Sequence, residues 1–498
     1  MSLTDLIKTY EDLRRKIKAL NYALWMISWD TETEVPSGAL AYRSKQVGIL
    51  SEELYKLTTS EEMIKVVKEL YDRKDELDEV LAREIYLAEK RIEKQLKIPM
   101  EEYVEYQMLI AQTQSIWADA KRQNNYELFK PSLEKIVELT KKRIKYLETD
   151  ELKGYDVLLD EFEEGMTSVK YDHFFNTLKK DLVPFVMEVI NKKQKTFAFD
   201  KLNYPIDLQK QFVSYLMDVL GYDQKHGLIK ESEHPCTSNV SSTDVRITNH
   251  YYEDNFTSGI FSAIHEMGHA LYEQQVDPAL DDTMLAGGAS MALHESQSRF
   301  YENIIGRSYA FWQAHYPKLQ ATFKDQLKEV TLDQFYQYIN NSYASYIRTD
   351  ADELTYSLHI MIRYEIEKDL MEERITVDEL PQVWNSLTEK YLGIVPRNDQ
   401  EGILQDVHWS AGLFGYFPTY ALGSAYSAQI YEAMKRDLDI EKELLNGTTL
   451  AINKWLQEKI HRYGQSKAPI EIFESAVNAK FDASYFVTYL KDKYQNLK

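Results

Sequence analysis

Two histidines and a glutamate within five consecutive residues are the side chains best suited to chemistry. They are His265, Glu266 and His269, in the segment HEMGH. Residues four apart on a helix share one face, so both imidazoles can bind one metal ion. Glu266 then lies beside the open position of the ion, where its carboxylate can take a proton from water. Zinc would lower the pKa of that water from ~15.7 toward ~7 and supply a nucleophile at neutral pH.

The surrounding residues favour a buried helix for this motif. Its flanks are apolar at Phe261, Ile264, Ala270 and Leu271, and Gly268 allows another backbone to approach closely. A buried face with two histidines and a glutamate costs free energy unless a ligand satisfies these groups. We therefore predict a metal site on this helix.

A catalytic zinc ion needs a third protein ligand and one open position. The downstream candidates are Glu273, His294, Glu295 and Glu302. Glu273 lies a further turn along the same helix and would have to reach back. Glu295 lies on a second predicted helix that can pack against the first, and we favour it as the third ligand. His294 points about 100° away from Glu295, which suits a supporting role.

Several motifs, taken in order, resemble those of the carboxypeptidase Taq family of zinc metallocarboxypeptidases. Besides HEMGH and the following HESQSRFYEN, the matches are HPC at His234–Cys236, DVRIT at Asp244–Thr248, IRTDADEL at Ile347–Leu354 and GILQDVHW at Gly402–Trp409. The matches run over roughly residues 234–425. One departure is Cys236, where the family usually carries phenylalanine, and we expect a tolerated packing change there.

The resemblance implies a mainly α, two-lobed zinc-peptidase fold with a deep groove, similar to neurolysin and angiotensin-converting enzyme. It also implies that single C-terminal residues are removed from peptides, with one zinc ion per chain, or cobalt in its place, and that the chain forms a homodimer. The nearest alternative is an oligopeptidase or dipeptidase on the same scaffold. A non-catalytic helical binding protein with a retained metal site is a further alternative, which Glu266 disfavours because a structural site needs no carboxylate there.

A carboxypeptidase must also bind the terminal carboxylate of its substrate. The planar guanidinium of arginine can bind both carboxylate oxygens. Arg348 in IRTDADEL is the residue that matches the family, although an ion pair to Asp350 or Asp352 is the structural alternative. Arg246 in DVRIT competes for this role, unless its motif instead shapes the edge strand of the groove.

Oxyanion stabilisation needs hydrogen-bond donors besides the metal. His408 and Tyr420, twelve residues apart in the sequence, resemble the pair that serves this purpose in the wider neurolysin-like group. Tyr416 is the alternative tyrosine. Asp406 could either orient His408 or cap a helix.

Long helices must position these residues. Glycine (18) and proline (12) are scarce among the 498 residues, which favours helices over a many-stranded sandwich. The charged run at 72–94 predicts a solvated helix face, and Thr257 or Ser258 is the expected cap of the metal-site helix. Alternating β-branched and polar residues at 234–256 predict a short hairpin or small sheet beside that helix. Apolar residues recur at helical spacing over 3–29, 71–99, 99–122, 126–147 and 167–192.

Composition bounds the class of protein. The chain has 59 Lys+Arg against 80 Asp+Glu, a net charge of −21, which argues against a general nucleic-acid binder. A single cysteine fits a reducing compartment. The N-terminus lacks the pattern of a signal peptide, and the most apolar early stretch, 20–29, is half of the ~20 residues that span a bilayer. We therefore expect a cytoplasmic protein that acts on peptides, without a nucleic-acid or membrane partner.

Length alone suggests about three domains at ~150 residues each. The proposed functional residues, however, run from 265 to 420 and must converge on one site. We therefore expect one catalytic unit over residues 1–498. Within it, we expect 1–230 to form a helical wall of the groove and 231–498 to form the metal site and the substrate-binding part.

Overall fold

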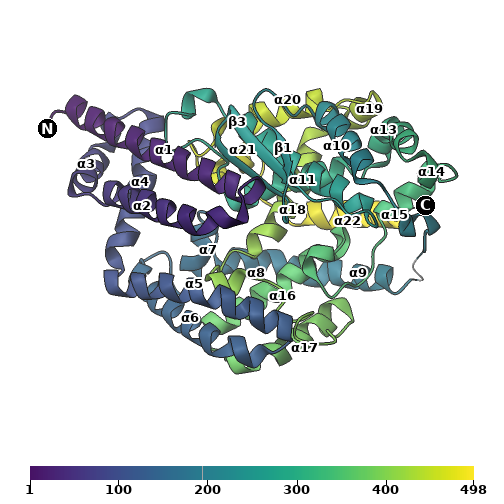
Figure 1. Cartoon of the computed structure of the whole chain (residues 1–498), viewed down its shortest axis with the longest axis horizontal. Coiled ribbons are helices and arrows are strands. Elements are labelled where there is room, and N and C mark those ends of the chain that lie inside the picture. The colour runs from purple at the N-terminus through teal and green to yellow at the C-terminus, as the bar shows by residue number, and fades with distance from the viewer. Residues whose placement is uncertain (193–194, 498) are drawn as a thin grey trace.

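Helices dominate the structure, a computed structural model that describes residues 1–192 and 195–497 (Figure 1). A single small sheet lies within the described residues. No helix among them is long and apolar enough to cross a bilayer. The main hydrophobic core is one cluster of buried side chains. Its members lie between Tyr106 and Tyr494 in the sequence and come from both lobes of the molecule. The mainly α fold predicted from the sequence is confirmed.

The first four helices form a layer with a small hydrophobic core of its own. Leu6, Val67 and Ile85 are fully buried in this core. The side chains of Ser60 and Asp78 accept hydrogen bonds from the first turns of two of the helices, which fixes where those helices begin. The helices are α1 (Leu3–Thr33), α2 (Leu40–Thr58), α3 (Glu61–Tyr71) and α4 (Glu79–Lys97).

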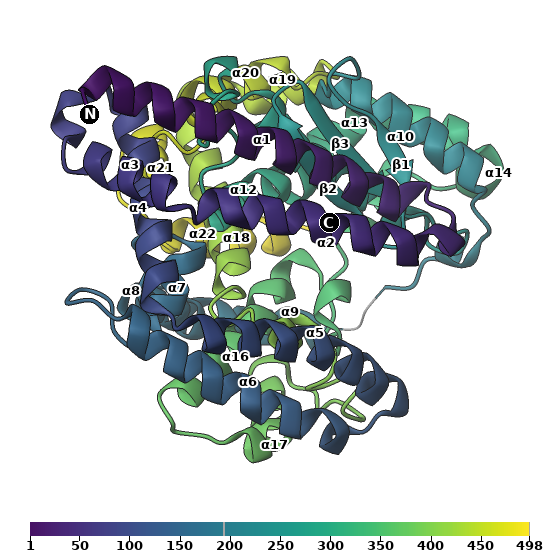
Figure 2. The same cartoon turned by 60° about the vertical axis from the view of Figure 1, so that its left-hand side comes forward.

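The next helices, together with two from later in the chain, build the lower lobe in Figures 1 and 2. A π-helix at Leu178–Leu182 joins two of them. The elements of this lobe are α5 (Met100–Gln123), α6 (Tyr126–Leu147), α7 (Asp156–Phe162), α8 (Ser168–Thr177), α9 (Val183–Ile190), α16 (Glu353–Met371) and α17 (Leu380–Leu392).

The remaining helices surround the sheet in the upper lobe. One of them, α18, contacts α12 in its own lobe and α16 in the lower lobe, so it connects the two. These helices are α10 (Ile206–Leu220), α11 (Phe256–Gln274), α12 (Met291–Arg299), α13 (Tyr309–Thr322), α14 (Lys324–Leu327), α15 (Leu332–Ile339), α18 (Pro418–Met434), α19 (Ile440–Leu445), α20 (Leu450–Lys459), α21 (Pro469–Val477) and α22 (Ser484–Gln495).

The sheet contains the predicted hairpin and one strand that the sequence did not reveal. Strands β2 (Cys236–Ser241) and β3 (Asp244–Asn249) pair antiparallel, with Thr237 opposite Ile247. Strand β1 (Ile229–Glu231) pairs parallel to β3, which gives the order β1-β3-β2. The DVRIT segment therefore forms the central strand, and β1 and β2 are the edge strands instead.

One local prediction about helices is wrong, and a second holds except at one residue. Helix α11 begins at Phe256, so its cap is Asn255, whose side chain accepts a hydrogen bond from Ser258 N (3.2 Å), and not Thr257 or Ser258. The charged run that predicts a solvated face contains Glu84, which is 0% exposed. Glu84 is buried because its carboxylate accepts hydrogen bonds from Tyr10 of α1, from Arg14 of α1 and from the backbone of the loop before α12.

Candidate active site

His265, His269 and Glu295 place three possible ligand atoms within 4.8 Å of one another. Helix α11 supplies both histidines one turn apart, and α12 supplies the glutamate. Oε2 of Glu295 lies 3.7 Å from Nε2 of His265 and 3.6 Å from Nε2 of His269. Atoms that bind one zinc ion tetrahedrally at ~2.1 Å lie roughly 3.4 Å apart, so the arrangement fits such an ion.

Close approach of α11, α12 and α18 makes this cluster possible. A methyl group at Gly268 would lie 2.7 Å from the backbone oxygen of Gln297, so only glycine lets α12 approach α11 without a shift. A methyl group at Gly423 of α18 would lie 2.7 Å from Cβ of Glu295. The close approach expected at Gly268 is thus confirmed, and α18 is brought against the metal cluster from the other side.

The other candidates for the third ligand support the two histidines from behind. Oε2 of Glu302 lies 2.8 Å from Nδ1 of His265. Nδ1 of His294 lies 2.5 Å from Nδ1 of His269, and its Nε2 lies 2.7 Å from Oε1 of Glu273. Such contacts fix the orientation of metal-binding imidazoles and leave Nε2 of each free to face the ion.

The charge of the cluster also suits a divalent cation. Arg299 donates from Nε to Glu295 Oε1 (2.7 Å) and from Nη1 to Glu302 Oε2 (3.0 Å). Although burial opposes ionisation, Arg299 lowers the pKa of Glu302 to about 2 and also lowers that of Glu295. The cluster and its surroundings therefore hold four carboxylates and two guanidinium groups, which is an excess of two negative charges. The carboxylates are those of Glu266, Glu273, Glu295 and Glu302, and the guanidinium groups are those of Arg299 and Arg307.

Glu266 lies next to the cluster and is 7% exposed. Burial is the main reason why its pKa is raised. The hydroxyl of Thr237, on edge strand β2, lies 2.7 Å from Oε2 of Glu266 and donates to it. A carboxylate that is held in place and has a raised pKa is suited to accept a proton from water.

His408 and Tyr420 are brought together, as the sequence predicted. Nε2 of His408 lies 3.4 Å from the hydroxyl of Tyr420 on α18. Burial lowers the pKa of His408 to about 4, so the ring is neutral at pH 7. The ring of Tyr416, the alternative tyrosine, lies 5.2 Å from that of Tyr420 and packs edge-on against Phe162. Because Gly423 contacts Glu295, Tyr420 lies one helical turn from that contact.

Arg348 is buried beside this pair, but its acidic partner is neither of the two that the sequence suggested. Its Nε and Nη2 donate to Oδ1 of Asp406 at 3.0 and 2.8 Å. Nε of Arg363 donates to Oδ2 of the same carboxylate (2.7 Å). Two guanidinium groups thus share one carboxylate, which leaves one positive charge. The guanidinium of Arg348 lies 5.3 Å from the ring centre of Tyr420.

The structure also settles the contacts of the other expected residues. Asp406 neither caps a helix nor bonds to His408, because both of its oxygens bind arginines. Arg246, the competitor of Arg348, binds both oxygens of Asp244 and lies over the ring of Trp25 on α1. Arg246 therefore joins the sheet to α1.

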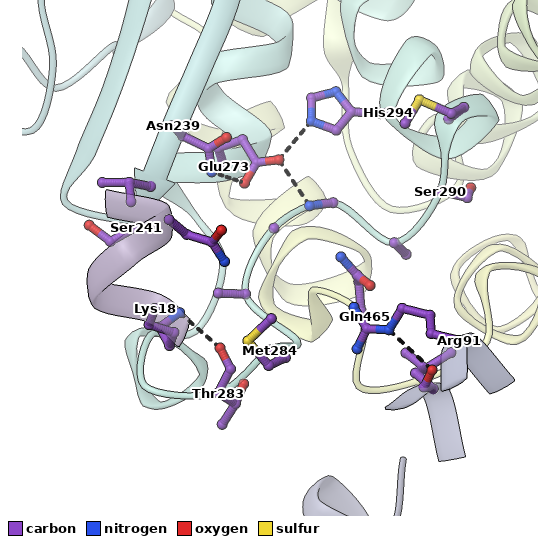
Figure 3. Close-up of a pocket in the computed structure, with 18 of the residues that line it drawn as sticks. Lys18, Arg91, Asn239, Ser241, Glu273, Thr283, Met284, Ser290, His294 and Gln465 are labelled. Atoms are coloured by element: carbon purple, nitrogen blue, oxygen red, sulfur yellow. Dashed lines mark hydrogen bonds and ion pairs between the residues drawn. The ribbon is translucent and has the colours of Figure 1, made fainter. Parts of the chain in front are cut away.

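A cavity of about 1390 Å³ lies between α1, α4, strand β2 and the loop before α12. Figure 3 shows Asn239, Glu273 and His294 on one side of it and Arg91 on the other. It reaches the metal cluster through Glu273 and His294. A second cavity of about 640 Å³ shares Phe162 and other lining residues with the first.

Sequence reasoning missed three residues of the site. Arg299 follows Glu295 by four residues, so helical spacing could have revealed it. Thr237 adjoins the HPC motif, but only the folded sheet places it against Glu266. Arg363 carries no local signal, since it is one of many buried residues of α16.

Comparisons with known proteins show which family the chain resembles over nearly its whole length. A sequence profile described as "Carboxypeptidase Taq (M32) metallopeptidase" matches residues 9–494. "Carboxypeptidase 1" of Bacillus subtilis is 42% identical, over 99% of both chains. The crystal structure of a carboxypeptidase of the same family from Deinococcus radiodurans superposes with a TM-score of 0.95 at 32% identity, over 99% of both chains. "Metallocarboxypeptidase 1" of Trypanosoma cruzi superposes with a TM-score of 0.93 at 30% identity, over 98% of this chain and 100% of that one.

Proposed function

Because the chain belongs to the carboxypeptidase Taq family of metallopeptidases, we propose that it is a zinc enzyme that releases single C-terminal amino acids from peptides. The enzyme class, a metallocarboxypeptidase, follows from the family. The observation that carries the finer proposal is the surplus positive charge that Arg348 and Arg363 leave after sharing Asp406, with the Arg348 guanidinium 5.3 Å from the ring centre of Tyr420. A free terminal carboxylate is the substrate group that this charge would bind.

His265, His269 and Glu295 would hold the metal ion. Their donor set of two imidazoles and one carboxylate, with an excess of two negative charges around it, fits zinc, and cobalt is the alternative. When bound, zinc polarises the peptide carbonyl and makes water more acidic. Glu302 and His294 keep the two imidazoles in position for the ion.

Arg348 would bind the terminal carboxylate and thereby set which peptide bond is cut. Its guanidinium is already held by Asp406, so little side-chain entropy is lost when the substrate binds. With the terminus fixed, the last peptide carbonyl is the one presented to the catalytic groups. A peptide with an amidated terminus lacks the negative charge that this position needs.

Glu266 would act as the general base and then as the general acid. It accepts a proton from the attacking water and passes it to the leaving amine. The hydrogen bond from Thr237 fixes the carboxylate during these steps. His408 and Tyr420 would donate hydrogen bonds to the oxyanion that forms on the carbonyl, because neutral imidazole N–H and phenol O–H groups are both donors.

The remaining parts of the proposal concern the whole chain. We infer that residues 1–498 act as one catalytic unit, with 1–230 as groove wall and 231–498 as metal and substrate part, because the main core joins residues 106–494 and α1 contacts strand β2. We also propose that the protein acts in the cytoplasm as a homodimer, as the resemblance to the family suggests. Light scattering after size-exclusion chromatography measures the oligomeric state.

One peptide offered in two forms tests the activity. The peptide is incubated as the free acid and as the C-terminal amide, with and without a chelator, and products are followed by mass spectrometry. We expect stepwise loss of single residues from the acid alone, and no reaction with the chelator. Release of dipeptides or internal cleavage would instead support the oligopeptidase or dipeptidase alternative. Absence of any reaction with zinc restored would favour a binding protein.

A further inference from the structure

One wall of the large cavity carries more cations than carboxylates. This wall is formed by α4, α6, α7 and the residues just after α7, and its charged residues are Lys90, Arg91, Lys94 and Arg143 against Asp160, Glu161 and Glu164. The excess is one positive charge, with Glu164 already paired to Arg83, in a chain whose net charge is −21. The composition of the protein therefore does not account for this concentration of positive charge.

Arg91, Lys94 and Arg143 line both cavities, and we call these three residues the basic neck. Arg143 and Lys94 share one carboxylate, Glu161, whose oxygen lies 3.7 Å from the Lys94 ammonium. Arg91 is exposed and makes no ion pair with any residue that the structure describes. Its Nε donates only to the backbone oxygen of Leu87 (3.2 Å). The positive charge of Arg91 is thus available to a ligand.

The wall opposite the basic neck is acidic, but most of its carboxylates are already engaged. Asp244 pairs with Arg246, and Asp281 accepts hydrogen bonds from the backbone and side chain of Ser242. On the same side, Glu273 accepts hydrogen bonds from Asn239 and the Gly288 backbone and contacts His294. Asp282 also lies on this wall, near Lys18. The two walls therefore differ in the charge that they offer to a peptide.

Beyond the basic neck, the second cavity is lined mainly by aromatic and aliphatic side chains. Four tyrosines contribute to it, namely Tyr55, Tyr103, Tyr106 and Tyr146. Its floor includes residues 411–413, in the segment between His408 and Tyr420. Phe162, which lines both cavities, packs against Tyr416 at 5.1 Å. The neck thus lies between the cavity that reaches Glu273 and His294 and an aromatic chamber, which we define by those four tyrosines.

We propose that the basic neck binds an aspartate or glutamate side chain of the substrate, N-terminal to the bond that is cut, and that the aromatic chamber takes residues beyond it. This inference rests on the proposed carboxypeptidase function. If Arg348 holds the terminus, the rest of the peptide must leave the catalytic residues through neighbouring space. The two adjacent cavities, of about 1390 and 640 Å³, which share lining residues, provide that space.

A peptide series locates the acidic preference. A neutral peptide with one free-acid terminus is made with a single glutamate, glutamine or lysine placed at each position in turn upstream of the last bond. Release of the terminal residue is measured as kcat/KM at low salt. We expect at least one position where glutamate exceeds lysine by about three- to tenfold, as one or two exposed ion pairs would give. This ratio should fall as ionic strength rises.

Two kinds of variant, one that removes positive charge from the basic neck and one that removes negative charge, test whether the neck causes the preference for glutamate. Arg91→Met combined with Lys94→Met should bring the glutamate-to-lysine ratio close to one. Glu161→Gln removes the only carboxylate that the neck residues share and should raise the ratio. Lys454→Met is the matched control, because Lys454 is an exposed lysine of α20 outside both cavities and should leave the ratio unchanged.

The possible outcomes separate this inference from the function on which it rests. We expect a short N-blocked dipeptide not to extend to the neck, so all these variants should cleave it like the parent protein. If that dipeptide and the longer peptides are all inert, the proposed function fails. If peptides are cleaved but no position distinguishes glutamate from lysine, or if the neck variants keep the ratio of the parent, the inference about the neck is wrong.

Discussion

Arg348 is the residue on which recognition of the substrate terminus depends. Replacing it with methionine leaves Asp406 paired with Arg363 but removes the charge beside Tyr420. We expect kcat/KM for free-acid peptides to fall roughly 30- to 1000-fold, as the loss of one buried charge-assisted contact of about 2–4 kcal/mol predicts. The amidated peptide should remain uncut, as with the parent protein.

Arg246→Met is the control for Arg348→Met, because Arg246 is engaged with Asp244 and Trp25. It should keep the preference for the free acid. If the arginine at 246 rather than the one at 348 proved necessary for that preference, the assignment of the carboxylate site would be wrong. Metal content, measured in both variants, should equal that of the parent protein.

The residues of the site differ in how far the sequence could predict them. His265, His269 and Glu295 could be found because helix geometry places residues four apart on one face and because their motif is distinctive. The partner of Arg348 could not, since Asp406 lies 58 positions away and meets it only in the folded chain. Thr237 and Arg363 escaped prediction for the same reason, as long-range packing alone gives them their contacts.

At the scale of elements, glycines set the distance between the helices that carry the site. Gly268→Ala would place a methyl group 2.7 Å from backbone atoms of α12. We expect the free energy of unfolding to fall by about 1–3 kcal/mol and metal affinity to decrease, because α12 must shift. Denaturant titration and metal binding measure the two effects.

Gly48→Ala in α2 provides the matched control, since a methyl group there has nothing within 4 Å. That substitution should raise the free energy of unfolding by about 0.5–1 kcal/mol, through helix propensity alone. Equal effects of the two alanines would contradict the close approach of α11 and α12.

The segment between His408 and α18 is held by one buried carboxylate of α16. Glu367 accepts hydrogen bonds from the Trp409 indole (2.7 Å), the Tyr155 hydroxyl (2.6 Å) and the backbone of Gly415 (2.7 Å). A glutamine would present an amide donor to one of these three donors. We expect Glu367→Gln to lower kcat about 10- to 100-fold, with KM within about twofold and metal content unchanged.

Glu365→Gln is the control for Glu367→Gln, because Glu365 lies on the same helix but contacts Tyr391 and Lys179 instead. It should leave kcat unchanged. A rise in KM without a fall in kcat for Glu367→Gln would show that the carboxylate does not position His408 and Tyr420.

Helices and strands could be predicted where the hydrophobic pattern was long, and the prediction failed where that pattern was short. Periodicity located the first long helix, and alternation located the hairpin of β2 and β3. Strand β1 was missed because its three residues, Ile229–Glu231, carry no alternation of their own and become a strand only beside β3. The buried Glu84 was missed because a charged helix face does not reveal that a second helix covers it.

At the scale of the whole molecule, buried histidines couple stability to pH. His315 on α13 is 2% exposed, and burial lowers its pKa from 6.5 to about 4. The unfolded chain therefore binds this proton first, so the contribution of His315 is full above pH 6.5 and is lost as pH falls toward 4. Burial raises the pKa values of Glu163 and Glu367 to about 7, so their contributions to stability change with pH in the opposite direction. The pH dependence of the free energy of unfolding of the parent protein therefore does not isolate His315.

Comparison with a variant isolates this contribution. His315→Gln cannot take up the proton, so the stability gap between parent and variant should narrow by about 2–4 kcal/mol between pH 7 and pH 4. Urea titrations at several pH values measure the gap. A gap that stays constant over this range would show that His315 is not held neutral by burial.

Turnover and metal content of Glu266→Gln, determined on one preparation, test the central proposal most directly. Glutamine keeps the shape of the side chain but cannot accept the proton of the attacking water. We predict one zinc ion per chain, as in the parent protein, and a loss of kcat of about 10²–10⁴-fold on a free-acid peptide. A variant that retains both its metal and its full turnover would contradict the role of Glu266 and the mechanism built on it.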